Sequence, residues 1–237
     1  MPKIQFLPAN GSLLNIAPNP EPAIIALPEW WRKQPSFLNG NNSVLNGTYQ
    51  STVKKCQAIF DGITTGYVLK CPIDILIKKN GDSFSVEVPN SFEQHSQWII
   101  SGHPRDQVSD MPINRDFYYS DILRIHPLWV AQTPKGYSTL FMQPILREKT
   151  PIQAIPAVID TDKFPSDGHL SFFLEKGFEG IIKQGTPIAQ IFPFKREEWT
   201  HSIEEYEPGY IENKRQIVRS TFTNGYRLKF WTKKEYK

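Results

Sequence analysis

Prolines recur at short intervals along the chain, and their spacing limits the fold more than any other feature of the sequence. The 237 residues include 20 prolines and 14 glycines. Because proline lacks a backbone N–H and breaks helix interiors, a mostly helical chain is excluded. Short apolar runs lie between the prolines, as in all-β sandwiches and barrels. We therefore expect an all-β protein.

Several runs carry the pattern of strands. Residues 66–71 lead into residues 73–78, and Asn80-Gly81 supplies a tight-turn dipeptide. Residues 83–88 then alternate between polar and apolar side chains with a period of two. This combination predicts a β-hairpin. Further short strands are expected at residues 122–126, 128–131, 137–142, 154–159, 170–174, 180–182 and 188–192.

Composition divides the chain into three parts. Residues 1–51 form a proline-rich arm and an Asn/Gly/Ser-rich loop, residues 52–200 a β core, and residues 201–237 an extension that is acidic first and then basic and aromatic. Residues 23–27 are expected to form a strand or a short buried segment, and residues 101–116 a long surface loop.

Two short helical features are also expected. Residues 52–61 predict a short helix ending at Gly62, and Pro28 favours a helical turn just after it. That turn carries Trp30 and Trp31, which cannot both face one core because they are adjacent. We expect one to anchor the arm and the other to serve a second surface or line a groove.

Charge and cysteine content exclude several classes. The net charge of +3 is too small to predict electrostatic binding to nucleic acid or to an anionic membrane. The sequence has no apolar run of membrane-spanning length and no signal-peptide pattern. Cys56 and Cys71 are too few for a disulfide scaffold, and we expect both to be small buried apolar residues in a cytoplasmic protein.

Residues 157–194 contain two segments that resemble motifs of the trimeric dUTPase and dCTP deaminase superfamily. A strand ends in Ile159-Asp160, and the segment from Gly185 to Gln190 matches the family's Gly-(Asp/Thr)-x-Ile-Ala-Gln pattern. Upstream, Thr133-Pro-Lys-Gly-Tyr137 is similar to the turn before that family's phosphate-binding motif. The resemblance implies a dUTPase-like (β-clip) fold, with a jelly-roll barrel or sandwich as the alternative. The chain, from its Pro-Glu-Trp-Trp start onward, also resembles a bacteriophage and bacterial family of unknown function.

Under this resemblance the catalytic residue is Asp160, which would activate a water. The other residues expected at a nucleotide are Lys135, Arg147, Phe164 and Gln190, and Mg²⁺ would be the cofactor. The family's Arg-Ser pair after the turn is replaced by Leu140-Phe-Met-Gln-Pro144, and its C-terminal glycine-rich lid is absent from the sequence. Because charge on a phosphate chain needs fixed cations and donors, the resemblance favours the fold over the chemistry.

Other catalytic and metal motifs are missing from the sequence. It contains no Gly-x-Ser-x-Gly elbow, no phosphate-binding P-loop and no Gly-x-Gly-x-x-Gly fingerprint. The five histidines include no His-x-Asp or His-x-Glu pair, so no metal site is predicted. We expect His126 to be a partly buried strand residue with a hydrogen-bonded ring.

The C-terminal extension is the remaining candidate surface. Arg227, Phe230 and Trp231 lie in a segment that predicts a strand, an Asn224-Gly225 turn and a second strand. We expect a solvated hairpin, with a contact to another subunit as one alternative and nucleic-acid binding as another.

Two functions therefore remain open. The first is a non-catalytic phage-type protein that serves assembly or protein binding, as a homo-oligomer or with another phage or host protein, and needs no cofactor. The second is a nucleotide hydrolase or deaminase of the dUTP or dCTP type with an altered active site.

Overall fold

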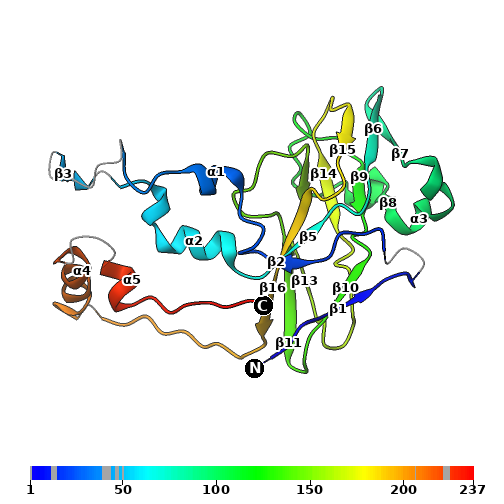
Figure 1. Cartoon of the computed structure of the whole chain (residues 1–237). Helices are drawn as coiled ribbons and strands as arrows, with labels where there is room; N and C mark the ends of the chain where they lie inside the picture. The colour runs from blue at the N-terminus through cyan, green and yellow to red at the C-terminus, as the bar shows by residue number, and fades with distance from the viewer. Residues whose placement is uncertain are drawn as a thin grey trace.

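The computed structural model describes residues 2–11, 15–38, 44–45, 48–49, 51–205, 207–220 and 225–237. Most of its regular structure is antiparallel β-sheet, which confirms the all-β prediction. Figure 1 shows the larger sheets gathered in one body, with several helices and the strand β3 standing outside it.

Three larger sheets make up the β body, and their strand orders are as follows. The first is β13 (Ala157–Ile159), β11 (Tyr137–Met142), β16 (Pro187–Lys195), β5 (Tyr67–Lys70) and β2 (Glu21–Pro22). The second is β12 (Ile152–Ala154), β14 (Ser171–Leu174), β9 (Ile122–Ile125) and β8 (Ile100–His103). The third is β15 (Gly180–Ile182), β6 (Ile75–Asn80) and β7 (Ser83–Glu87). The remaining pairs are β1 (Gln5–Pro8) with β10 (Trp129–Gln132), and β3 (Val44–Leu45) with β4 (Thr48–Tyr49).

The three larger sheets share one hydrophobic core. Leu69 and Phe141 come from the first sheet, Phe172 from the second and Ile75 from the third, and each is at most 1% exposed. These side chains belong to a single cluster. Burial alternates along β6, β12 and β14, as the period-two pattern predicts, whereas β5, β9 and β16 bury consecutive residues.

The hairpin between residues 73 and 88 is confirmed. β6 pairs with β7 in a register that sets Asn80 opposite Ser83, which leaves a two-residue turn. Gly81 in that turn has φ of 58°, in the left-handed region that glycine enters without steric cost. The turn therefore consists of Gly81 and Asp82, one position later than the Asn80-Gly81 dipeptide predicts.

Three expectations about strands and loops need correction. Residues 23–26 form a turn, with Ile25 N–H donating to the Pro22 carbonyl, rather than a strand. The start of the 101–116 loop belongs to β8, which pairs with β9 as an edge strand. The expected strand 154–159 is divided between β12 and β13 in different sheets, because Pro156 supplies no ladder donor between them.

The helices lie mainly at one side of the β body (Figure 1). We call α1 (Glu29–Lys33), α2 (Gln57–Thr64), α4 (Tyr210–Ser220) and α5 (Gly225–Lys229) the helical lobe. The short helices η3 (Val53–Lys55), η4 (Asn90–His95), α3 (Ser96–Ile99) and η5 (Arg105–Val108) complete the described elements. α2 confirms the helix expected near residues 52–61, and it runs two residues past Gly62.

The C-terminal extension does not form the predicted hairpin. Residues 225–229 are the helix α5, and residues 221–224 lie outside the described residues. An ideal Cβ on Gly225 would lie 2.3 Å from the Val218 carbonyl oxygen, so the glycine permits close packing of α5 on α4. Gly225, expected in a strand turn, therefore serves a helix contact instead.

Candidate functional site

Asp160, the predicted catalytic residue, is engaged by two side chains of neighbouring strands. It follows β13, and its Oδ1 accepts a hydrogen bond of 2.6 Å from Ser138 Oγ and lies 3.1 Å from Arg196 Nη1. The Ser138 hydroxyl and the Arg196 guanidinium hold the pKa of Asp160 below its ordinary value. A carboxylate stabilised in its charged form by an arginine is a weak base for activating water.

Arg196 is a site residue that the sequence did not indicate. Its guanidinium also pairs with both oxygens of Asp162, and Asp162 Oδ2 accepts the Gly136 N–H at 2.7 Å. These bonds tie the end of β16 to the residues after β13 and to the turn before β11. No local motif marked Arg196, because its partners lie on other strands.

Gln190 performs a structural task. The side chain is fully buried; its Oε1 accepts the Ile145 N–H at 3.0 Å, and its Nε2 donates to the carbonyls of Gly62, Ile63 and Thr65. The last carbonyls of a helix have no partner within the helix, so Gln190 caps α2 from the β body. It has no free group to offer a nucleotide.

Arg147 also bonds to the end of α2, and it connects that helix to the N-terminal arm. Its Nη2 donates to the carbonyls of Ala23 and Ile63 at 3.3 and 3.4 Å. Burial lowers the pKa of Arg147, and its Nε is buried with no partner among the described residues. The guanidinium therefore lies between the arm and α2, away from Asp160.

The predicted nucleotide residues do not converge. Ser138 touches Asp160 at one end of β11, whereas Met142 at the other end pairs with Gln190. At ~3.4 Å per residue this separates the two predicted ligands by roughly 13 Å along the strand. Lys135 is exposed on its turn, and the 57%-exposed Phe164 stacks on His169 at 6.1 Å between ring centroids.

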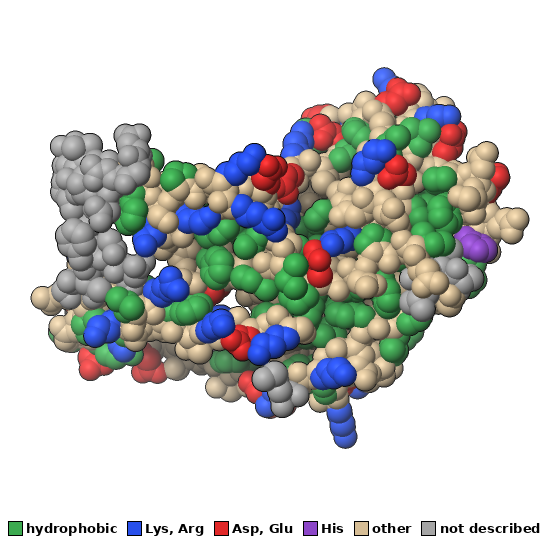
Figure 2. Space-filling view, in the orientation of Figure 1, with side chains coloured by type: hydrophobic (Ala, Val, Ile, Leu, Met, Phe, Trp, Pro, Cys, Tyr) green, Lys and Arg blue, Asp and Glu red, His purple; other side chains and the backbone are tan. Residues whose placement is uncertain are grey.

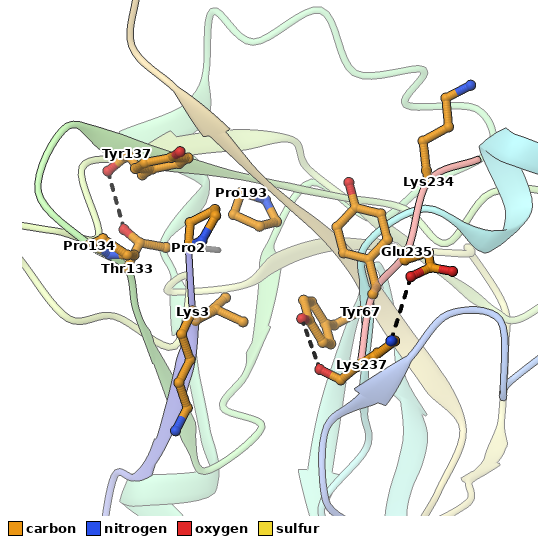
Figure 3. A pocket seen from close by; sticks show the side chains of 12 residues that line it. Pro2, Lys3, Tyr67, Thr133, Pro134, Tyr137, Pro193, Lys234, Glu235 and Lys237 are labelled. Carbon is orange, nitrogen blue, oxygen red and sulfur yellow. Dashed lines mark hydrogen bonds and ion pairs between the residues drawn. The ribbon is translucent and has the colours of Figure 1, made fainter. Parts of the chain in front are cut away.

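A cavity of about 580 Å³ does lie beside the Thr133–Tyr137 turn. Figure 3 shows Tyr137 and Pro2 on one side of it and Tyr67 and Lys237 on the other. Tyr67 Oη donates to the main-chain oxygen of Lys237 at 3.3 Å. Both ends of the chain therefore form its walls, and Lys135 is not among the lining residues.

The predicted interaction tryptophans mostly hold the helical lobe together. Trp31 is 3% exposed and packs near Phe60, whereas Trp30 Nε1 donates to the Leu146 carbonyl at 2.7 Å. Trp231 Nε1 donates to both oxygens of Asp61 on α2, at 2.8 and 3.1 Å. The expectation that the adjacent tryptophans face different surroundings is confirmed.

The helices α4 and α5 form an exposed groove of about 360 Å³, which we call the α4–α5 groove. It is lined by apolar and basic residues: Tyr210, Ile211, Lys214, Arg215, Val218, Arg219, Tyr226 and Phe230. Lys214 Nζ lies 5.2 Å from the Tyr210 ring centroid and 5.7 Å from that of Phe230. Figure 2 shows Lys and Arg side chains around hydrophobic ones on this side of the molecule.

A second unusual surface is the segment between β16 and α4. We call residues 197–205 the acidic linker; they include Glu197, Glu198, Glu204 and Glu205. Between these charges Trp199 is 86% exposed and Ile203 is 95% exposed. The acidic linker therefore presents two large apolar side chains that the rest of the described chain leaves uncovered.

Cys71 is buried as expected, and burial raises its pKa to about 12. Cys56, expected to be buried as well, is exposed at the start of α2. Among the residues that the structure describes, no cluster of three or more His, Cys, Asp or Glu side chains could hold a metal ion. The described helices include none that could cross a membrane.

Comparison with known proteins adds no family. No protein-family model matches the chain, and no curated protein matches it.

Proposed function

We propose that the protein is a self-associating binding module of dUTPase-like fold, in which the acidic linker of one copy occupies the α4–α5 groove of another. The observation that carries this proposal is complementarity within one chain. The groove offers an apolar floor flanked by Lys214, Arg215 and Arg219, and the linker offers exposed Trp199 and Ile203 between glutamates. Opposite charges around matched apolar surfaces favour specific docking.

Exchange between copies has to satisfy the connectivity of the chain. The linker runs from the end of β16 to the first turn of α4 (Figure 1), and Tyr210 and Ile211 of that turn line the groove. Two copies related by a two-fold axis can each insert a linker into the partner's groove. Such an isologous arrangement closes on itself and buries both exposed surfaces twice.

Nucleotide chemistry is not part of the proposal. Asp160 is paired with Arg196, Gln190 is buried against α2, and Arg147 faces the arm. We expect dUTP, dCTP and their ribose analogues, with or without Mg²⁺, to leave the melting temperature unchanged. A true ligand at about 100 times its dissociation constant stabilises by about 2.7 kcal/mol, so a shift of several degrees would revive the hydrolase alternative.

The direct test is the mass of the purified protein in solution by light scattering. We expect a dimer at micromolar concentration that weakens as NaCl rises from about 50 to about 500 mM, because salt screens exposed charges. Trp199→Ser with Ile203→Ser is expected to give a monomer. A wild-type monomer overturns self-association, even if that monomer captures some other protein.

Reversed charges give a sharper control. Copy A carries Glu204→Lys and Glu205→Lys, and copy B carries Lys214→Glu and Arg219→Glu. In each copy alone, the linker and the groove carry charge of the same sign, so both are expected to stay monomeric. In the mixture, the basic linker of A meets the acidic groove of B and the acidic linker of B meets the basic groove of A, so an A–B dimer is expected. Dimers of A alone or B alone, as stable as wild type, would contradict the proposed occupant.

A further inference from the structure

A serine, a histidine and an aspartate form a hydrogen-bonded chain on the second sheet, apart from the helical lobe. Ser101 in β8 lies with its Oγ 2.9 Å from His126 Nε2. On the other side of the ring, His126 Nδ1 lies 2.7 Å from Asp167 Oδ2. This is the atom-to-atom order of a catalytic Ser-His-Asp triad, which is recognised by geometry and not by sequence motif.

The aspartate is fixed in the orientation that such a triad needs. Asp167 is largely buried, and its second oxygen, Oδ1, accepts the His169 N–H at 2.9 Å. Burial raises the pKa of Asp167, but the hydrogen bonds from His126 and from the His169 N–H outweigh this and leave it below its ordinary value. A charged Asp167 keeps the proton on Nδ1 of His126, so Nε2 is free to accept the proton of Ser101.

The strand ladder places a cation next to the serine. Ser101 pairs with Arg124 across β8 and β9, so the two side chains project from the same face of the sheet. Arg124 Nε is buried and has no hydrogen-bond partner among the described residues. A guanidinium beside the nucleophile can stabilise the negative charge that develops when it attacks.

Backbone strain occurs at the same place. Leu128 has φ of 64° and His169 has φ of 43°, and each lies two residues after a member of the chain, His126 or Asp167. Residues other than glycine rarely adopt this region, and strained positions cluster at functional sites. The strained positions thus follow two members of the hydrogen-bonded chain closely in the sequence.

We infer that Ser101 is a nucleophile for short-chain aryl esters, with His126 as its general base and Asp167 as the group that orients the ring. Ser101 is half-buried, and the side chains of His126 and Asp167 are 16% and 11% exposed, so only a small acyl group reaches the hydroxyl. The exposed stacked pair of Phe164 and His169, next to Asp167, offers a surface for the aromatic part.

The reaction follows from these positions. His126 Nε2 takes the Ser101 proton as Oγ bonds to the ester carbonyl carbon, and the carbonyl π electrons move to its oxygen beside Arg124. The tetrahedral adduct collapses, the bond to the aryl oxygen breaks, and the leaving group receives the proton from His126. Water then releases the acid by the same steps and restores Ser101.

The test is labelling with a fluorophosphonate, which phosphonylates activated serines, followed by peptide mapping. We expect one adduct on Ser101, absent in Ser101→Ala, unchanged in Ser171→Ala of the same sheet, and slowed about 10²–10⁴-fold in His126→Asn. 4-Nitrophenyl acetate hydrolysis should fall in parallel. An adduct on another serine, or equal labelling of wild type and His126→Asn, would overturn the inference.

A cysteine variant separates reactivity from folding. Ser101→Cys keeps a nucleophile in place, and exposed Cys56 supplies an internal reference thiol in the same molecule. We expect iodoacetamide to alkylate Cys at position 101 at least about ten times faster than Cys56, and His126→Asn to abolish the difference. Equal rates at the two thiols would show that His126 does not activate position 101.

Discussion

At the scale of single residues, the contacts of one predicted nucleotide ligand are structural. Gln190 stands in a segment that resembles a nucleotide-binding motif, yet its amide joins β16 to the end of α2. The motif shows only that a strand with this pattern is present. Whether its glutamine meets a ligand or a helix depends on what the fold places next to it.

Replacing Gln190 with leucine is expected to destabilise the protein by roughly 3 kcal/mol. The change leaves the Ile145 N–H and the carbonyls at the end of α2 buried without partners. Urea unfolding followed by circular dichroism measures the loss. The control is Gln97→Leu at an exposed position in α3, which is expected to change the free energy of unfolding by less than about 0.5 kcal/mol. Equal effects of the two substitutions would contradict the capping role.

The charge of Asp61 predicts that the free energy of unfolding depends on pH. Burial raises its pKa, but hydrogen bonds from Lys234, Trp231 and Gln57 outweigh this and leave the pKa below its ordinary value. A carboxyl with a lowered folded-state pKa stabilises the protein above its unfolded-state pKa of about 3.9, and the contribution disappears as pH falls through the folded-state value.

We therefore expect wild type to be more stable than Asp61→Asn at pH 7, with the difference shrinking steadily below about pH 4. Urea midpoints of both proteins across this range provide the measurement. A difference that stays constant with pH would show that the charge of Asp61 is not the source of the stabilisation.

At the scale of secondary-structure elements, two Asn-Gly dipeptides had different outcomes. In the first dipeptide, Asn80 is the last paired residue of β6, and Gly81 begins the two-residue turn of the predicted hairpin. In the second dipeptide, Gly225 is the first residue of α5 and lies close to the Val218 carbonyl of α4, so the residues after it form a helix instead of a strand. A turn dipeptide specifies a hairpin only when both flanking segments find a sheet to join.

Gly225→Ala is expected to separate α5 from α4. The added methyl would lie 2.3 Å from the Val218 carbonyl oxygen, so the helices must move apart at a cost of roughly 1–3 kcal/mol. We expect lower helix content by far-UV circular dichroism and loss of the dimer. Gly11→Ala, whose Cβ would meet no atom within 4 Å, is the matched control and is expected to behave as wild type.

At the scale of the whole molecule, the C-terminal tail connects the β body to the helical lobe. Tyr236 packs edge-on against Tyr67 of β5 with ring centroids 5.7 Å apart, and Tyr67 bonds to the Lys237 main chain. Farther back, Trp231 and Lys234 hold Asp61 of α2. The tail therefore connects the first sheet to α2.

Deleting residues 235–237 is expected to lower the melting temperature by several degrees, because the deletion removes a half-buried tyrosine and its ring contact. Differential scanning calorimetry measures the change. Lys237→Ala keeps the main-chain oxygen that accepts the Tyr67 hydrogen bond, and we expect it to have the melting temperature of wild type. If the deletion variant also melted at the wild-type temperature, the tail would not stabilise the connection between the first sheet and α2.

The sequence alone determined the all-β class, the β6–β7 hairpin and the short helix near residue 60, because each is encoded by neighbouring residues. Only the tertiary structure decided the sites. Ser101 meets His126 across 25 positions and His126 meets Asp167 across 41, through the pairing of β8 with β9 and the turn before β14. Period-two patterns show which face of a strand is buried, but they leave open which strands become neighbours. The register between distant strands sets those contacts.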